Sequence, residues 1–218
     1  MRGIVPRFMQ MHPDVRIALV EDGSAKLGGA LERGTIDLAI GAMTSDMGFE
    51  SCALFPLVAL LAVPANHRLG RRPNVEISEL AEEEMLLLRP DFMTRQLYDG
   101  ACKVAHISPR MLLESASPHC LLALVQSGLG LAVIPSTVRL SKSHPQAVPL
   151  TQNGRALGLW MHVLWDPRRY TSPAALNFIA ALREQTQADY PGKALGIGHL
   201  GNPRAVRTRS QSGIGTAK

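Results

Sequence analysis

The spacing of apolar and polar residues changes along the chain between a helical period and an alternating one. Pro13 ends the first helical pattern, Ser24 is placed to cap the second, and Gly34 follows its last apolar residue. The elements predicted for the first part of the chain are a helix at residues 2–11, a strand at 15–22, a helix at 25–33 and a strand at 37–41. This order is typical of a parallel sheet covered by helices.

The same alternation returns in the second part of the chain. The predicted strands are 49–65, 85–88, 110–115, 131–135, 147–150 and 157–165, and the predicted helices are 93–106, 118–128 and 173–185, with short helical turns at 77–81 and from Ser136. Two such sets predict an α/β fold of two Rossmann-like subdomains with a ligand cleft between them. We expect subdomain I to comprise residues 1–63 and 164–186, subdomain II residues 64–163, and a disordered basic tail residues 187–218.

Composition argues against a nucleic-acid-binding surface on the folded part of the chain. The 218 residues are 46% apolar, enough for a sizeable core, whereas only 5% are aromatic, so stacking on bases is poorly supplied. The net charge is +5, but residues 186–218 carry five basic side chains and one acidic one, so residues 1–185 are nearly neutral. A nucleic-acid groove needs clustered Lys and Arg, and no such cluster is visible in the body.

The residues that carry chemistry form no catalytic or metal-binding pattern. The three cysteines include no CxxC pair, and the seven histidines form neither HxxxH nor HExxH. GxSxG is also absent, so we expect no metal, no cofactor and no enzymatic activity. The N-terminus has no uninterrupted apolar core of signal-peptide length, and no apolar run reaches the length of a membrane span, which predicts a soluble, cytoplasmic protein without a membrane partner.

A glycine pair in the stretch SPHCLLALVQSGLGLAVIP raises the question of a phosphate-binding loop. A dinucleotide fingerprint runs from strand to glycines to helix, so that the phosphates meet the helix N-terminus. Here the order is helix, Gly128 and Gly130, then strand. We therefore interpret Gly128 as a helix stop with positive φ and Gly130 as a tight entry into the strand.

Six motifs in order resemble the effector-binding domain of LysR-type transcriptional regulators. They are the PDV strand and the G-x-x-D-L-A-I strand, both in HPDVRIALVEDGSAKLGGALERGTIDLAIG, then FPLVALLAVPANHRL, ISELAEEEMLLL, LLALVQSGLGLAVIPS with its G-x-G-x-A-x-x-P signature, and SPAALNFIAALRE as the last helix. Together they cover about residues 4 to 185. The resemblance implies a fold like the type II periplasmic binding proteins, a small-molecule effector between two lobes, and homodimers or tetramers.

Two departures from the family pattern affect what this chain does. The helix-turn-helix that implies DNA binding in the family is not in the sequence, so DNA binding is expected only through a domain absent from this chain. The family's first strand, which would lie between strands 15–22 and 37–41, is also missing. Either the chain is a truncated gene product, the two strands close up, or another segment fills the gap.

The candidate effector contacts lie where helices begin beyond the carboxyl ends of strands. Ser117 is placed to cap a helix, Pro118 suits its first position, and free backbone N–H groups there favour an anion. Simple capping explains the same residues. With the weight of the resemblance added, the candidate effector-binding residues are Ser117, His119, Thr94, Arg95, Gly23, Ser24 and Thr44.

Cys120 has two interpretations. It could serve as a redox sensor, because it lies near the positive end of the helix after Ser117, which lowers a thiol pKa. We favour a buried small apolar residue instead, because no resolving cysteine is evident.

The sequence thus predicts the effector-binding domain of a LysR-type regulator that senses a small anionic metabolite such as a carboxylate. The alternatives are a solute-binding protein for a small anion, which shares the fold but needs a signal peptide, and a lyase or transferase on the same fold. The missing acid/base pair speaks against the enzyme.

Overall fold

The computed structural model describes residues 3–42, 48–140 and 145–193 of the chain. The helices are α1 (Ile4–Met11), α2 (Ser24–Arg33), α3 (Met93–Ala105), α4 (Pro118–Gln126) and α5 (Pro173–Ala188), with 3-10 turns η1 (Arg68–Arg71) and η2 (Ile77–Leu80). The strands are β1 (Ala39–Ala42), β2 (Glu50–Val63), β3 (Val75–Glu76), β4 (Glu84–Leu88), β5 (Arg110–Ser115), β6 (Leu131–Pro135), β7 (Gln146–Gln152), β8 (Arg155–Ala156) and β9 (Gly158–Trp165). Most of these elements lie where the sequence predicts them.

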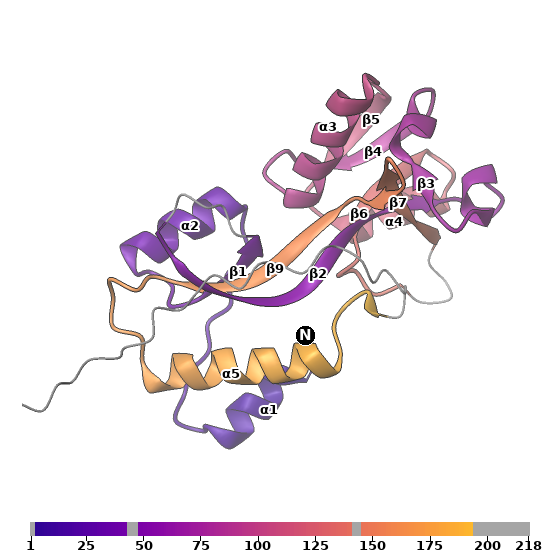
Figure 1. Ribbon diagram of the computed structural model, residues 1–218. Helices are drawn as coiled ribbons and strands as arrows, with labels where there is room; N and C mark the ends of the chain where they lie inside the picture. The colour runs from indigo at the N-terminus through magenta and orange to yellow at the C-terminus, as the bar shows by residue number, and fades with distance from the viewer. Residues whose placement is uncertain (1–2, 43–47, 141–144, 194–218) are drawn as a thin grey trace, which may run out of the picture.

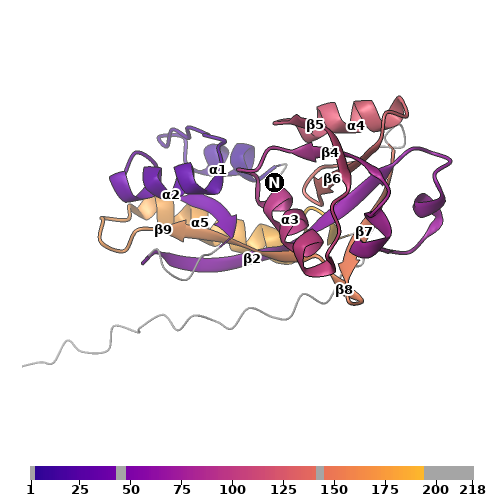
Figure 2. The same ribbon diagram turned by 90° about the horizontal axis from the view of Figure 1, so that it is seen from above.

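Two groups of elements are joined by the long strands β2 and β9, which run side by side from one group to the other (Figures 1 and 2). Strand order is β1-β9-β2-β6-β4-β5, and β7 pairs with β2, β3 and β8. The pairs β4–β5, β4–β6 and β3–β7 are parallel, whereas β1–β9, β2–β9, β2–β6 and β2–β7 are antiparallel. The sheet is therefore mixed rather than parallel throughout, because β2 and β9 run antiparallel to each other and to the other strands with which they pair.

The buried apolar residues divide into separate clusters that define two lobes. Lobe I comprises α1, α2, β1, α5 and the adjoining parts of β2 and β9, with buried residues that include Ile4, Phe55 and Leu182. Lobe II comprises α3, α4, β3–β8 and the rest of β2, with cores on both faces of the sheet. Along β2 the change of cluster falls between Phe55 and Val58.

Residues 15–22 correct the sequence interpretation, because they form no strand in the structure. Leu19 and Val20 are 77% and 59% exposed, and β1 pairs with β9 alone among the described residues. Residues 15–22 and β1 therefore do not pair with each other, and no other described segment fills the gap between them. An alternating pattern forms a strand only when another strand supplies its hydrogen bonds.

Two smaller predictions are also wrong. Ser24 is the first residue of α2 rather than its cap, which is Gly23, and no helix follows Ser136. Ser136 instead exchanges hydrogen bonds with Val58, since its backbone N–H donates to the Val58 carbonyl and its hydroxyl accepts from the Val58 N–H. None of the helices within the described ranges is long and apolar enough to span a membrane.

Candidate functional site

The predicted contacts of lobe II gather beyond one edge of its parallel strands. Strands β4 and β5 are parallel neighbours, and just past their carboxyl ends the Arg89 N–H donates to the Ser115 carbonyl at 3.1 Å. Helix α3 begins five residues after β4 and α4 three residues after β5. Open α/β sheets bind ligands at such an edge, where helix N-termini present free N–H groups.

Ser117 caps α4 as the sequence predicts. Its hydroxyl oxygen accepts the Cys120 N–H at 3.3 Å, its own N–H donates to the Ser115 hydroxyl at 3.1 Å, and Pro118 opens the helix. Among the described residues the Ser117 hydroxyl proton has no acceptor, so it is available to a ligand oxygen. Ser117 and His119 are both exposed.

Cys120 corrects another prediction, because it is exposed rather than buried. The buried face of α4 consists of Leu121, Leu122 and Val125, which pack on the sheet. Cys120 precedes this face by one position and lies outside it.

Thr94 and Arg95 begin α3 in different surroundings. Thr94 is only 4% exposed. Arg95 donates to both Asp99 carboxylate oxygens at 2.8 and 2.9 Å, to the Leu88 carbonyl at 2.8 Å and to Glu114. Burial lowers the Arg95 pKa, but the bonds to Glu114 and Asp99 outweigh it and raise that pKa, so the guanidinium stays charged and links α3 to β4 and β5.

Lobe I contributes the start of α2 to the same region. Gly23 is buried against the loop between β4 and α3, close to Asp91, whereas Ser24 is exposed. Thr44 lies outside the described residues. The structure thus brings Gly23 near the loop that leads to Thr94, while Ser117 lies beyond the neighbouring strand.

Gly128 and Gly130 have the structural role expected from the order of helix, glycines and strand. Gly128 follows α4 with φ of +83°, and the backbone N–H groups of Gly128 and Leu129 donate to the carbonyls of Val125 and Leu124. A Cβ atom on Gly130 would lie 2.7 Å from the Glu84 carbonyl oxygen. Gly130 is therefore needed for the close approach of β6 to β4.

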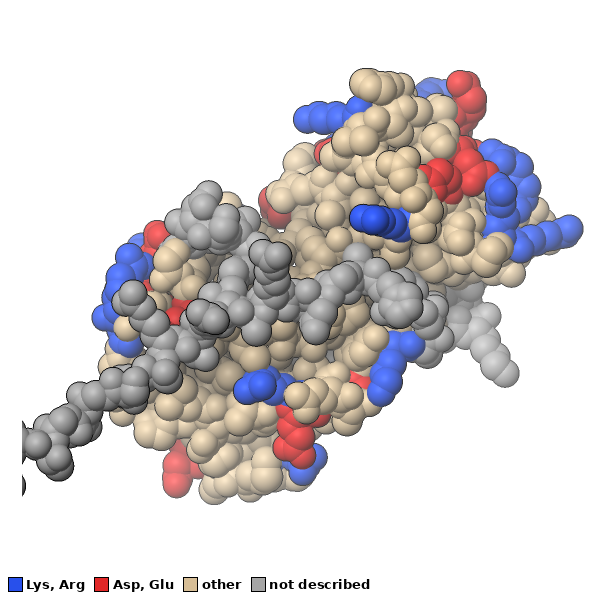
Figure 3. Space-filling view, viewed as in Figure 1, with Lys and Arg blue, Asp and Glu red and all other residues tan. Residues whose placement is uncertain are grey.

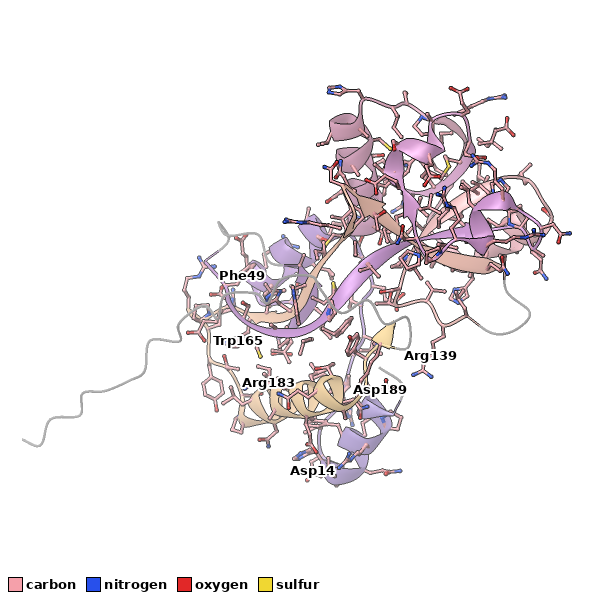
Figure 4. The ribbon with its side chains drawn as sticks, turned by 45° about the vertical axis from the view of Figure 1, so that its right-hand side comes forward. Asp14, Phe49, Arg139, Trp165, Arg183 and Asp189 are labelled. Carbon is pink, nitrogen blue, oxygen red and sulfur yellow. The ribbon has the colours of Figure 1, made fainter. Side chains whose placement is uncertain are left out.

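Two hollows of the described surface lie away from these residues. A cavity of about 10 Å³ lies between α1 and the end of α5, next to Arg139 and Asp189 (Figure 4), and is too small for a metabolite. An open hollow of about 500 Å³ lies on the β7–β8 turn. No group of three His, Cys, Asp or Glu side chains in the described ranges could hold a metal ion.

The charges on the face seen in Figure 3 are scattered, with Lys and Arg interspersed among Asp and Glu. Many of the described basic side chains are paired, such as Arg68 with Glu83 at 2.6 Å and Arg110 with Glu84 at 2.8 Å. This arrangement does not form a basic groove of the kind that binds nucleic acid.

The bilobal mixed sheet, with helix N-termini at one strand edge, defines an α/β fold like that of the type II periplasmic binding proteins. The family model of the LysR substrate binding domain matches residues 1–187, and the chain belongs to this family.

Curated relatives are transcriptional regulators. The chain is 28% identical over 178 residues to the uncharacterized HTH-type transcriptional regulator YnfL of Escherichia coli, covering 78% of this chain and 58% of that protein. It is 26% identical over 188 residues to the HTH-type transcriptional regulator XapR of Escherichia coli, covering 84% and 62%. The chain therefore spans about three fifths of the length of these relatives.

Solved structures share the fold. The C-terminal domain of a probable LysR family transcriptional regulator from Rhodococcus sp. RHA1 matches with a TM-score of 0.72 at 22% identity, covering 84% of this chain and 91% of that one. The QuiR effector binding domain in complex with shikimate matches with a TM-score of 0.71 at 18% identity, covering 86% and 90%. The Synechocystis PCC6803 CcmR regulatory domain in complex with 2-PG matches with 0.75 at 15% identity, covering 84% and 89%.

Sequence reasoning missed Arg89 and Asp91, which lie between the predicted contacts of the two lobes. Arg89 donates to both carboxylate oxygens of Asp91, at 3.2 and 2.7 Å. The only sequence signal is the RPD turn after β4, which is typical of any strand-to-helix connection.

Proposed function

We propose that this domain senses a small anion, with a carboxylate as the first class to test, bound between the lobes. The observation that carries the proposal is the convergence of two helix N-termini beyond the paired ends of β4 and β5. There the Ser117 hydroxyl has a proton to donate, and Thr94 lies buried at the start of α3. The dipoles of α3 and α4 favour negative charge at this point.

The seven predicted contacts differ in how well they fit this role. Ser117 and Thr94 offer hydroxyl groups at the helix starts, and Gly23 faces them from lobe I. Arg95 holds the start of α3 in place through its two carboxylate partners, Asp99 and Glu114. Ser24, His119 and Thr44 complete the proposed set.

Binding would act by population shift rather than by catalysis. An anion that contacts both lobes binds the closed arrangement better than the open one, and the difference in affinity sets how far the equilibrium moves. The relatives with helix-turn-helix names support a readout through a DNA-binding domain outside this chain. We infer a cytoplasmic homodimer or tetramer, with α1 and α4 at the interfaces.

The names of the relatives favour one of the alternative functions. They are named as transcriptional regulators, which favours sensing over solute transport and over a lyase or transferase on the same fold. The neighbour in complex with shikimate, which is a carboxylate, supports the ligand class.

A matched pair of cap substitutions tests the site. Ser117→Ala and Ser172→Ala each remove a serine that caps a helix opened by proline, α4 and α5 respectively. Each should lower the free energy of unfolding by about 1 kcal/mol. Only Ser117→Ala should also weaken anion binding, roughly tenfold, because it removes a hydrogen bond to a charged group.

The binding measurement is a thermal-shift screen of shikimate, citrate and simple carboxylates on the protein joined to its DNA-binding domain, followed by calorimetry on any hit. Equal Kd values for Ser117→Ala and Ser172→Ala would contradict the proposed site. No stabilisation by any carboxylate would contradict the ligand class.

A further inference from the structure

The two lobes touch where the start of α2 meets the loop between β4 and α3. A Cβ atom on Gly23 would lie 3.0 Å from the Asp91 Cβ and 3.2 Å from the Asp91 carbonyl oxygen. Rotation of the Asp91 side chain moves neither atom. A methyl group at position 23 therefore requires the two segments to move apart by a few tenths of an ångström, and a larger side chain requires more.

The backbone does not explain this glycine. Gly23 has φ of −64° and ψ of 151°, an extended conformation that any residue adopts without strain. Gly34, at the other end of α2, has φ of +69°, where glycine is favoured by the backbone itself. The requirement for glycine at position 23 comes from its neighbour in lobe II.

Charges of both signs meet across this contact, and the two carboxylates repel each other, because Asp91 opposes the lowering of the Asp22 pKa. In lobe I, Lys26 pairs with Asp22 at 3.1 Å, and in lobe II, Arg89 pairs with Asp91 at 2.7 Å. The hydrogen bonds from Arg89 lower the Asp91 pKa, and Lys26 of the other lobe lowers it further. Asp22 likewise adds to the raised pKa of Arg89, after the dominant bonds from Asp91.

We propose that Gly23 and Asp91 are positioning residues that set the closest approach of the two lobes, with Lys26 and Arg89 favouring the approach. A glycine permits a closer spacing than alanine would, and the attractions of Lys26 to Asp91 and of Asp22 to Arg89 oppose the repulsion between Asp22 and Asp91. The proposal rests on the proposed sensing function only for what the contact is used for, because the contact itself exists whichever effector binds.

Disulfide trapping tests the contact directly. Gly23→Cys with Asp91→Cys, in a Cys120→Ser background that removes the exposed thiol, should cross-link under mild oxidation. The control pairs Gly23→Cys with Gly100→Cys, because Gly100 lies on α3 in open space. We expect the first pair to form its disulfide roughly tenfold faster, since a disulfide needs Cβ atoms about 4 Å apart.

Distance measurement tests the spacing. Nitroxides on Glu32→Cys in α2 and Lys103→Cys in α3, in the same background, report the lobe separation by pulsed electron paramagnetic resonance. Gly23→Phe should lengthen or broaden the distance distribution, because its ring has no space beside Asp91, whereas Gly23→Ala should shift it by only a few tenths of an ångström. Lys26→Glu should also broaden it at low salt, and less at high salt because exposed charges are screened. The control Gly100→Ala should change nothing.

Two outcomes would overturn the proposal. One is cross-linking of the 23–91 pair no faster than that of the 23–100 pair, and the other is a distance distribution that Gly23→Phe leaves unchanged. Neither measurement needs an effector, so a failure here is distinct from a failure of the anion-binding proposal. Conversely, if no carboxylate binds but both tests succeed, the contact stands alone.

Discussion

The two lobes are built from similar elements but differ in how completely those elements are paired. The clusters of lobe II contain 27 fully buried apolar residues, and those of lobe I contain nine among the described residues. In lobe II the central strand β4 has a partner on each side. In lobe I the four-residue β1 has one partner, and residues 15–22 have none that the structure describes.

This difference shows what an alternating pattern can and cannot specify. Residues 15–22 retain the alternation of a strand, with Val15 and Ile17 partly buried, yet Leu19 and Val20 face solvent. The segment MLLL has no alternation and forms the fully paired β4. Backbone partners therefore decide the outcome more strongly than the local pattern does.

The largest expected effect comes from truncating one buried leucine in each lobe. Leu86 is 0% exposed in the middle of β4, and Leu31 is 1% exposed in a cluster of three buried residues. We expect Leu86→Ala to lower the free energy of unfolding by about 4 kcal/mol and Leu31→Ala by about 2 kcal/mol, because a thinner core relaxes around the cavity. Urea denaturation followed by circular dichroism measures both.

Equal losses for the two leucines would show that lobe I is packed as tightly as lobe II. Amide hydrogen exchange adds a second reading. Residues 15–22 should exchange at close to the unfolded rate, and β4 should be among the slowest segments.

The next comparison is between Gly130, where a side chain has no space, and Gly128, where the backbone has a positive φ. Gly130→Ala should cost about 2 kcal/mol, because its methyl group would push β6 away from the Glu84 carbonyl. Gly128→Ala, at φ of +83° in open space, should cost about 1 kcal/mol. Thermal unfolding measures the ranking.

The same Gly130→Ala protein tests whether the lobes unfold separately. Faster exchange confined to β4, β5 and β6 would mean that lobe II loses stability alone. Equal acceleration in α1 and α5 would mean that β2 and β9 make the two lobes one cooperative unit, and the comparison drawn above would fail.

The sequence predicts the regular elements well where a strong local signal and a partner coincide. Ser117 with Pro118 and Gly128 mark both ends of α4, and the structure confirms them. The mixed direction of the sheet depends on how β2 and β9 pair, and Gly158 pairs with Val58 across a hundred residues. No local pattern encodes such pairing, so the sequence did not predict that β2 and β9 would run antiparallel to each other.

The candidate site could be predicted in part for the same reason. Helix starts after strands are visible in sequence, so Thr94 and Ser117 could be placed at one sheet edge. The contact of Gly23 with Asp91 depends on how the lobes sit, and the carboxylate partners of Arg95 come from α3 and β5. Both sets of contacts depend on the tertiary structure, so the sequence alone could not predict them.

A smaller effect distinguishes the lobes by pH, beginning with Glu76 in lobe II. Burial raises the Glu76 pKa, but hydrogen bonds from the Thr151 hydroxyl and the N–H groups of Asn153 and Gly154 outweigh it and lower that pKa below 4.5. Its contribution to stability is present above pH 4.5 and is lost as the pH falls through the native pKa. Glu76→Gln should lower the Tm by about 2 °C at pH 7, and by less at pH 3.

The smallest effect concerns His162 in β9, where the strand pairs with Gly41 and Ala53 of lobe I. Burial lowers the His162 pKa below 6.5, against the hydrogen bond to the Trp160 carbonyl at 3.1 Å, so the native state favours the neutral ring. The unfolded chain then binds the proton more readily, and stability falls as the pH drops below 6.5 towards the native pKa. His162→Gln should flatten this slope between pH 7 and 5, measured as hydrogen exchange of β1 and β9. His119→Gln, at an exposed position, is the control. If His162→Gln leaves the slope unchanged, or the slope appears in β4 as strongly as in β9, this histidine does not set a separate pH response for lobe I.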